Sequence, residues 1–555
     1  MNRFVASWRS QLLTASVVGS RTLMQDVHLA SGYLNGVHPQ TLQLCLQGST
    51  GSRPSFMVHR CLQRPRGRLM RIDSDDLSRL AAEVIAEAPC SLEMPAGTGK
   101  TELLAACVAT AAALGDRSLV LTHTNAGVDA IRKRLRRFGV SASAVRVETI
   151  TSWAFTLSRS YPGIAGINVP EVPDWNSSRE YVEGAVLVAK TNAVRSLHAV
   201  SFGYLFVDEY QDCTVDQHEL VVQISEAVPG SVILGDRLQA IFGFDKKRPL
   251  MDWDTHVVRR YPSKNVPHLP QRWRNYNVAL GQWLLDIRPS LVDGGHFDFS
   301  TTSVAGIEWR QCDFKNAVQV VNKAAYGLSR TGESTVLLDK LAQQVANHAS
   351  RLGGSFAVME DVAGRFMAAK LAELPEEKNA LLALWLAQMA KSCFVGLAGL
   401  DATVQGRLEK GRTVSDLKRP GLLTVQAALD DLIANPVYEQ LCMSAAAIRA
   451  TSGLTLYRQE AWDDTIQAVG RGIVDETPPQ ESLAVVRDRL RHGGRGERRQ
   501  IASRTLLVKG LEFDHVIIAD VQNFTDPRQL YVALSRARKS VTVIGKSPIL
   551  RLGYE

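Results

Sequence analysis

The sequence predicts an α/β protein in which helices cover both faces of parallel β-sheets. A glycine-rich turn stands between an apolar, strand-like run and an apolar helical run near residue 97. Short strand-like runs then alternate with helical patterns, and this alternation is typical of a parallel sheet. Between about residues 364 and 499 the alternation gives way to Ala/Leu-rich helical runs, and it resumes afterwards. We therefore expect a helical insertion in the second part of the α/β fold.

The glycine-rich turn has the composition of a phosphate-binding loop. It follows the apolar run 90–94 and precedes the helical run 102–109. Gly97 and Gly99 let the backbone turn its N–H groups inward, and the N-terminus of the next helix adds partial positive charge. Lys100 is expected to reach the β- and γ-phosphates of a nucleotide, and Thr101 to bind Mg²⁺. The predicted loop consists of Pro95, Ala96, Gly97, Thr98, Gly99, Lys100 and Thr101.

Two further strand-like runs lead into polar residues. The run 204–207 ends in Asp208 and Glu209, and the run 231–235 is followed by Gln239. Asp208 suits a Mg²⁺ ligand, and Glu209 can orient or deprotonate an attacking water. Ligands bind at the carboxyl ends of parallel strands, so these side chains should meet the phosphate loop there.

Composition narrows the class of protein. The 555 residues carry a formal net charge of +8, which is compatible with a polyanionic partner without establishing one. No apolar run is long enough to span a bilayer, so we expect a soluble protein without a membrane partner. The 8 cysteines are scattered singly, with no CxxC pair, which favours free thiols in a reducing, cytoplasmic setting.

The segment before the α/β pattern is harder to interpret than the elements that follow it. Residues 1–72 are expected to form a poorly ordered N-terminal extension, and a small docking element is the alternative. One helix is expected from residue 178 to about 197. Further strands are expected at 307–309, 334–338, 356–359, 513–521 and 540–545.

An ordered set of short motifs resembles the UvrD/Rep/PcrA group of superfamily-one helicases. The most specific is Asp208-Glu209-Tyr210-Gln211-Asp212, which is similar to the DExQD of motif II. The match runs in order from the phosphate loop to Arg538. The other motifs are 95–101 (I), 121–125 (Ia), 149–152 (Ib), 235–244 (III), 269–274 (IV), 509–514 (V) and 531–538 (VI).

The resemblance implies a P-loop NTPase with two RecA-like domains and ATP, with Mg²⁺, in the cleft between them. It places the first domain at 73–264, with a short accessory insertion at about 155–200. The second domain is expected at 265–363 plus 500–555, with the helical accessory insertion at 364–499.

The resemblance also assigns roles to single residues. Asp208 would hold the metal, Glu209 would activate water and Gln239 would sense the γ-phosphate. Arg274 and Arg536 would reach across the cleft as arginine fingers. Trp273, where the family has Tyr, would stack on adenine, and Glu512 would bind the ribose.

Single-stranded or tailed duplex DNA is the partner that the resemblance implies, with movement in the 3′→5′ direction. Phe242 and Phe244 match aromatic positions that stack on bases, although packing in the core is the alternative. The remaining residues expected at DNA are His123, which replaces the customary Phe, Thr124, Asn125 and Thr151.

Departures from the family pattern leave parts of the function open. No Gln lies between Gln63 and Lys100 to read adenine, and Leu506 and Leu507 replace polar residues that usually touch DNA. The short insertions look like those of compact UvrD-like subunits in anti-phage defence systems, which act beside a separate nuclease. A helicase and a DNA-stimulated ATPase subunit of a repair or defence complex both remain. A scaffold without turnover is disfavoured by the intact set Lys100, Asp208, Glu209, Gln239, Arg274 and Arg536.

Overall fold

The computed structural model describes residues 74–171, 173–243, 248–361, 363–493 and 498–554. All of them belong to one compact unit. The expected N-terminal extension and the expected DNA contact Phe244 therefore lie outside the described residues.

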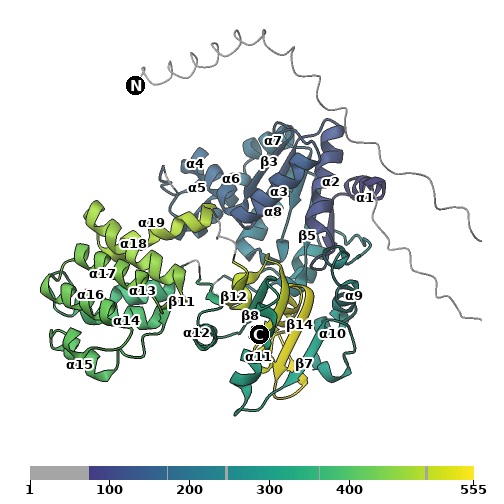
Figure 1. Cartoon of the computed structure of the whole chain (residues 1–555). Helices are drawn as coiled ribbons and strands as arrows, with labels where there is room; N and C mark the ends of the chain where they lie inside the picture. The colour runs from purple at the N-terminus through teal and green to yellow at the C-terminus, as the bar shows by residue number, and fades with distance from the viewer. Residues whose placement is uncertain (1–73, 172, 244–247, 362, 494–497, 555) are drawn as a thin grey trace, which may run out of the picture. The chain divides into compact units, whose positions relative to one another are not determined.

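The first sheet contains five parallel strands in the order β1-β5-β4-β2-β3; β3 and β5 are labelled in Figure 1. Alternate strand residues enter two separate cores. Val120 and Phe206 pack into one, and Leu119 and Leu205 into the other. The strands are apolar runs because both faces are covered. Their bounds are β1 (Cys90–Glu93), β2 (Ser118–Thr122), β3 (Val145–Thr149), β4 (Tyr204–Val207) and β5 (Gly230–Gly235).

In the first α/β part, helices precede β1 or connect these strands. Four are α1 (Ser74–Ala86), α2 (Lys100–Ala113), α3 (Asn125–Arg137) and α8 (Val215–Ala227). The others, between β3 and β4, are α4 (Ile150–Ser160), α5 (Pro162–Ala165), α6 (Ser178–Ala189) and α7 (Asn192–Ser201).

The prediction of one helix over 178–197 is wrong, because the chain leaves the helix at Thr191. Thr191 is extended, with φ −74° and ψ 140°, and its hydroxyl donates to the Val188 carbonyl at 2.8 Å. Such a local side-chain bond competes with helical pairing, so the helix ends there and a new one starts at Asn192.

The second sheet has six parallel strands in the order β7-β14-β13-β8-β12-β9. Its strands are β7 (Ile307–Gln311), β8 (Thr335–Leu338), β9 (Ala357–Val358), β12 (Gln500–Ser503), β13 (Phe513–Ile518) and β14 (Ala537–Gly545). β12 carries one large apolar residue, Ile501, which explains why its sequence gives no strand signal. The associated helices are α9 (Val278–Asp286), α10 (Arg288–Asp293), α11 (Ala317–Ser329), α12 (Ala342–Arg351) and α20 (Pro527–Leu534), and β6 (Gly295–Asp298) pairs with β15 (Ile549–Leu552).

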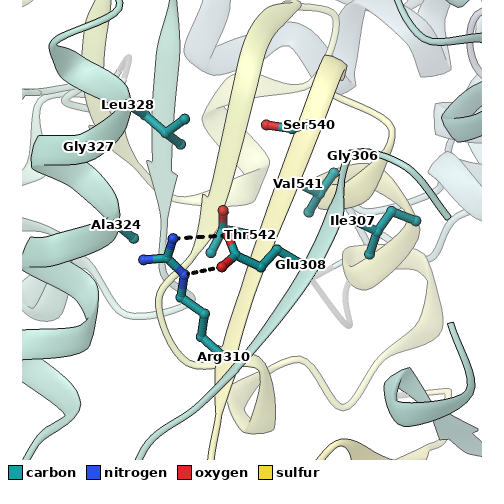
Figure 2. A pocket seen from close by; sticks show the side chains of 10 residues that line it. All are labelled: Gly306, Ile307, Glu308, Arg310, Ala324, Gly327, Leu328, Ser540, Val541 and Thr542. Carbon is teal, nitrogen blue, oxygen red and sulfur yellow. Dashed lines mark hydrogen bonds and ion pairs between the residues drawn. The ribbon is translucent and has the colours of Figure 1, made fainter. Parts of the chain in front are cut away.

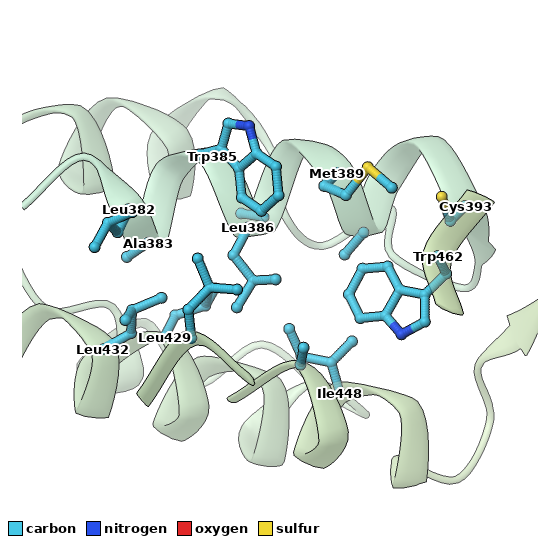
Figure 3. Packing of buried hydrophobic residues seen from close by; sticks show 14 of the residues in the cluster. Leu382, Ala383, Trp385, Leu386, Met389, Cys393, Leu429, Leu432, Ile448 and Trp462 are labelled. Carbon is cyan, nitrogen blue, oxygen red and sulfur yellow. The ribbon is translucent and has the colours of Figure 1, made fainter. Parts of the chain in front are cut away.

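The chain between β9 and β12 is mainly helical, and its helices have a hydrophobic core of their own. Figure 3 shows Trp385 and Leu386 facing Leu429, Ile448 and Trp462 in this core. The helices are α13 (Arg365–Ala372), α14 (Leu382–Cys393), α15 (Ala402–Glu409), α16 (Leu423–Ala434), α17 (Tyr438–Ala450), α18 (Gln459–Asp475) and α19 (Pro479–Gly493), with the strand pair β10 (Phe394–Val395) and β11 (Thr455–Leu456). The predicted fold class, parallel-sheet α/β with a helical insertion, is confirmed. No helix within the described residues is long and apolar enough to cross a membrane.

Candidate functional site

The predicted phosphate loop joins β1 to α2. Gly97 and Gly99 have φ of 72° and 98°, in the left-handed region that favours glycine. The Thr98 hydroxyl donates to the Pro95 carbonyl at 2.8 Å and closes the turn. Lys100 begins α2, so the open N-terminus of that helix faces the loop. This backbone is suited to hold an anion.

Lys100 lies between the two predicted catalytic carboxylates. Its Nζ is 3.1 Å from Asp208 Oδ1 and 2.6 Å from Glu209 Oε1, and the side chain is 8% exposed. Burial opposes the charge on Lys100, but the two carboxylates outweigh burial and raise its pKa. The Lys100 ammonium likewise outweighs burial at Glu209 and lowers the pKa of that carboxyl to about 2. At Asp208 burial dominates, and the pKa is raised despite Lys100.

Glu209 is held in an unusual position just after β4. Its φ of 55° is in the left-handed region, which non-glycine residues rarely adopt. The Gln211 side-chain amide donates to Glu209 Oε2 at 2.5 Å and fixes the carboxylate. Backbone strain of this kind tends to occur at functional sites.

The residues present fit a nucleotide with Mg²⁺. The Thr101 hydroxyl at the start of α2 and the Asp208 carboxylate supply the oxygen ligands that Mg²⁺ prefers. The buried Lys100 Nζ has two anionic neighbours but lacks good hydrogen-bond geometry to either. A phosphate group would offer this ammonium a further anionic partner.

Asp236, directly after β5, is a central residue that the sequence did not single out. It is 0% exposed and accepts hydrogen bonds from the Ala96 N–H at 3.0 Å and the Gln239 amide at 2.9 Å. Arg288 of α10 pairs with its other oxygen at 2.9 Å. Asp236 therefore ties the predicted γ-phosphate sensor Gln239 to the phosphate loop. The position of Asp236 directly after a strand, beside Gly235, is the feature of the sequence that could have indicated its role.

Arg536 enters the same cluster from the position directly before β14. It is 1% exposed, and its Nη2 donates to Gln239 Oε1 at 3.3 Å. Burial, together with the neighbouring Arg272 guanidinium, lowers the pKa of Arg536. Arginine stays charged in proteins, so the lowered pKa of Arg536 means that neighbouring groups do not fully balance its buried positive charge. An anion at this point would stabilise it. The tyrosine of the same motif, Tyr531, accepts a bond from the Ala96 N–H at 3.2 Å.

The segment before α9 lies directly against the phosphate loop. The Arg272 N–H donates to the Gly97 carbonyl at 3.0 Å, and a Cβ on Gly97 would meet the Trp273 ring at 2.6 Å. Trp273 is 0% exposed, and its indole N–H donates to the Ala537 carbonyl at 2.6 Å. The expected stacking of Trp273 on adenine would therefore require the ring to leave this position.

Arg274 and Glu512 lie near the loop but have other partners. Arg274 is exposed, and its Nη1 reaches Gln271 Oε1 at 3.4 Å, so the structure does not bring it to Gln239 as it does Arg536. Glu512 pairs with Arg272 at 2.8 Å. Arg272, which sequence reasoning passed over, thus contacts both the loop and the predicted ribose ligand.

The residues expected at DNA follow strand ends of the first sheet. Thr124 caps α3 by accepting from the Gly127 N–H at 3.0 Å, and Asn125 beside it is exposed. His123 Nε2 lies 3.3 Å from Cys213 Sγ, and burial lowers the pKa of His123 to about 4. Thr151 is half-buried in the first turn of α4. Phe242 is 45% exposed, which does not fit the core alternative for this residue.

A separate hollow of about 240 Å³ lies between α11 and the strands β7 and β14 (Figure 2). Glu308 and Arg310 pair at its wall at 2.8 Å. None of the predicted site residues lines it.

Comparison with known families gives two matches. An AAA domain matches residues 78–245, which include the phosphate loop, Glu209 and Gln239. The UvrD-like helicase C-terminal domain matches residues 507–544, which include Glu512 and Arg536. A search of curated proteins returns no significant match.

Proposed function

These two matches support a UvrD/Rep-like superfamily-one helicase, and on this premise we propose that the chain is an ATP-driven DNA motor. It hydrolyses ATP between two RecA-like domains and moves 3′→5′ along single-stranded DNA. The domain limits given above, 73–264 for the first and 265–363 plus 500–555 for the second, are part of this proposal. Its setting is a cytoplasmic repair or anti-phage pathway.

The observation that carries the proposal is the contact between Arg536 and Gln239. A buried arginine that directly precedes β14 of the second sheet reaches the predicted γ-phosphate sensor, which follows β5 of the first sheet, at 3.3 Å. Charge supplied from the opposite side of a cleft is a recurring device of phosphoryl transfer. The two sheets thus contribute to one site, as a motor that closes on ATP requires.

The chain's own residues divide the work of hydrolysis. Lys100 and the loop N–H groups bind and orient the phosphates, and Thr101 and Asp208 hold Mg²⁺, which when bound neutralises developing phosphate charge. Glu209, kept as a carboxylate by its lowered pKa, accepts a proton from the attacking water. Gln239 and Arg536 stabilise the charge on the transferring group.

Strand displacement on tailed duplexes tests the proposal. The isolated protein should unwind a 3′-tailed duplex in the presence of ATP and Mg²⁺ and leave a 5′-tailed duplex intact. Glu209→Gln is the control that keeps the fold and removes the water-activating group. Unwinding of the 5′-tailed duplex alone would contradict the direction.

A second candidate is a DNA-stimulated ATPase subunit that feeds a separate nuclease and unwinds little alone. One observation favours it. Leu506 and Leu507 are partly exposed in the turn before Lys509, and Leu511 is 41% exposed. Apolar side chains there reduce the polar contacts available to a DNA backbone. Hydrolysis stimulated by single-stranded DNA without displacement of either tailed duplex would select this candidate.

A further inference from the structure

Lys509 makes a buried contact between the two α/β parts. It stands between the turn 505–508 and β13, and its side chain is 8% exposed. Its Nζ lies 2.7 Å from Asp212 Oδ1 and 2.5 Å from the Gln239 carbonyl oxygen. Asp212 and Gln239 both follow strands of the first sheet, so one ammonium from the second part holds two segments of the first.

The same ammonium also lies over an aromatic ring. The Lys509 Nζ is 4.8 Å from the centroid of Phe242. A cation over a ring face within about 6 Å is attracted by the ring quadrupole. Phe242 is 45% exposed, so its ring contacts the buried charge and still faces solvent.

The partners of Lys509 lie beside the predicted catalytic groups. Asp212 ends the short turn η2 (Tyr210–Asp212) that begins directly after Glu209. Phe242 follows Gln239 by three residues in the chain. A displacement of Lys509 with the second sheet would therefore move both the segment of the predicted catalytic residue Glu209 and the aromatic residue Phe242.

The ion pair is only partly compensated. Burial raises the pKa of Asp212 to about 6, and the lowering effect of Lys509 does not cancel that rise. The neighbouring charged and titratable groups are Glu209, Lys100, His123 and Cys213. A buried pair of this kind contributes little net stability, which suits a contact that forms and breaks during a cycle.

We propose that Lys509 is a positioning residue that couples closure of the second sheet over the nucleotide to the hold of Phe242 on single-stranded DNA. When the sheets close, the ammonium fixes the Gln239 backbone and presents the Phe242 ring. When they open, both are released. This inference rests on the proposed function.

Nucleotide-dependent DNA affinity measures this coupling. Fluorescence anisotropy gives the Kd for a labelled oligothymidylate with and without a non-hydrolysable ATP analogue and Mg²⁺. The wild type should show at least about a fivefold ratio between the two Kd values, within the usual range for coupled sites. Lys509→Met should bring that ratio to within about twofold of unity while the analogue still binds.

Two variants separate coupling from stability. Lys264→Met removes a lysine that pairs with Glu87 away from the site, and it should retain the wild-type ratio. The double variant Asp212→Asn, Lys509→Met leaves no unpaired buried charge. It should recover the melting temperature lost in Lys509→Met without recovering the ratio.

Three results would overturn the inference alone. The first is a wild-type ratio in Lys509→Met, and the second is a ratio restored in the double variant, which would attribute the loss to Asp212 alone. The third is a ratio near unity in a wild type whose ATP hydrolysis DNA stimulates; the proposed function would then stand. Absence of DNA-stimulated hydrolysis in the wild type would instead overturn the proposed function, and the inference with it.

Discussion

At the scale of single residues, the site is a cluster of charged side chains that are mostly buried. Lys100 is held by Asp208 and Glu209, the groups that it would leave on binding phosphate. Arg536 is buried beside Gln239 with its pKa lowered. Buried charges are costly unless paired, so the binding of an anion is expected to stabilise this cluster.

Glu209, the proposed water-activating carboxylate, gives the first prediction. Glu209→Gln should retain ATP binding and lose hydrolysis, because only the proton acceptor for the attacking water is removed. Binding is measured with a fluorescent ATP analogue and turnover by phosphate release. Lys100→Ala, in contrast, should abolish hydrolysis by removing the phosphate-binding ammonium. Wild-type turnover in Glu209→Gln would show that the motif II assignment is wrong.

The pH dependence of stability follows from the same residue. The pKa of Glu209 is lowered to about 2 in the folded state, against about 4.3 in an unfolded chain. Its contribution is therefore fully present above about pH 4.3 and is lost as pH falls through about 2. Urea unfolding at pH 5 and pH 3 should show the difference between wild type and Glu209→Gln shrinking at the lower pH. An unchanged difference would contradict the Lys100–Glu209 pairing.

Arg536, which directly precedes β14, gives the next prediction. Arg536→Ala should reduce kcat by ~10³-fold or more, the usual effect of an arginine finger. The loss should fall on kcat rather than on the KM for ATP, since the charge acts on the transferring group. Arg274→Ala is expected to reduce turnover as well, although its side chain is exposed here. Near-normal turnover in both variants would argue against closure over ATP.

At the scale of elements, local pattern predicted the strands that build the site. β1, β4 and β5 are apolar runs that end in polar groups, and a parallel sheet brings such ends to one edge. β12 was missed because it has little strand composition of its own and forms by pairing between β8 and β9. Its register depends on neighbours that are distant in sequence.

Phe242, in the segment after β5, gives a prediction about DNA binding. Phe242→Ala should weaken single-strand affinity about tenfold, since stacking contributes about 1–3 kcal/mol per base and about 1.4 kcal/mol is one decade. The melting temperature should change little, because the ring is half exposed. Phe299→Ala is the matched control: that ring is 2% exposed, so its loss should cost ~3–5 kcal/mol of stability. Lower stability of Phe242→Ala with unchanged affinity would contradict the stacking role.

At the scale of the whole molecule, the site combines segments far apart in the chain. Sequence motifs predicted the loop, Glu209, Gln239 and Arg536, because each has a local signature. They did not predict that Asp236 binds Arg288, that Arg272 contacts Gly97 or that Lys509 reaches Asp212. The residues of each pair are separated by tens to hundreds of positions, and only packing of the two sheets joins them. The burial of Trp273 has the same origin.

If nucleotide binds where the two α/β parts meet, we expect it to stabilise the folded protein against unfolding. A ligand at about 100 times its Kd adds about 2.7 kcal/mol to the free energy of unfolding. A non-hydrolysable ATP analogue with Mg²⁺ should therefore raise the melting temperature measured by differential scanning calorimetry. Removal of Mg²⁺ with EDTA should reduce the shift, and Thr101→Val should make the protein insensitive to that removal.

The most direct test of the account is the steady-state rate of ATP hydrolysis with and without single-stranded DNA. We predict that DNA accelerates hydrolysis by the wild type, and that Arg536→Ala and Glu209→Gln lose the accelerated rate while remaining folded and bound to DNA. A wild-type rate that does not respond to DNA would contradict the central claim that this chain is a DNA-stimulated ATPase with its site between the two α/β parts.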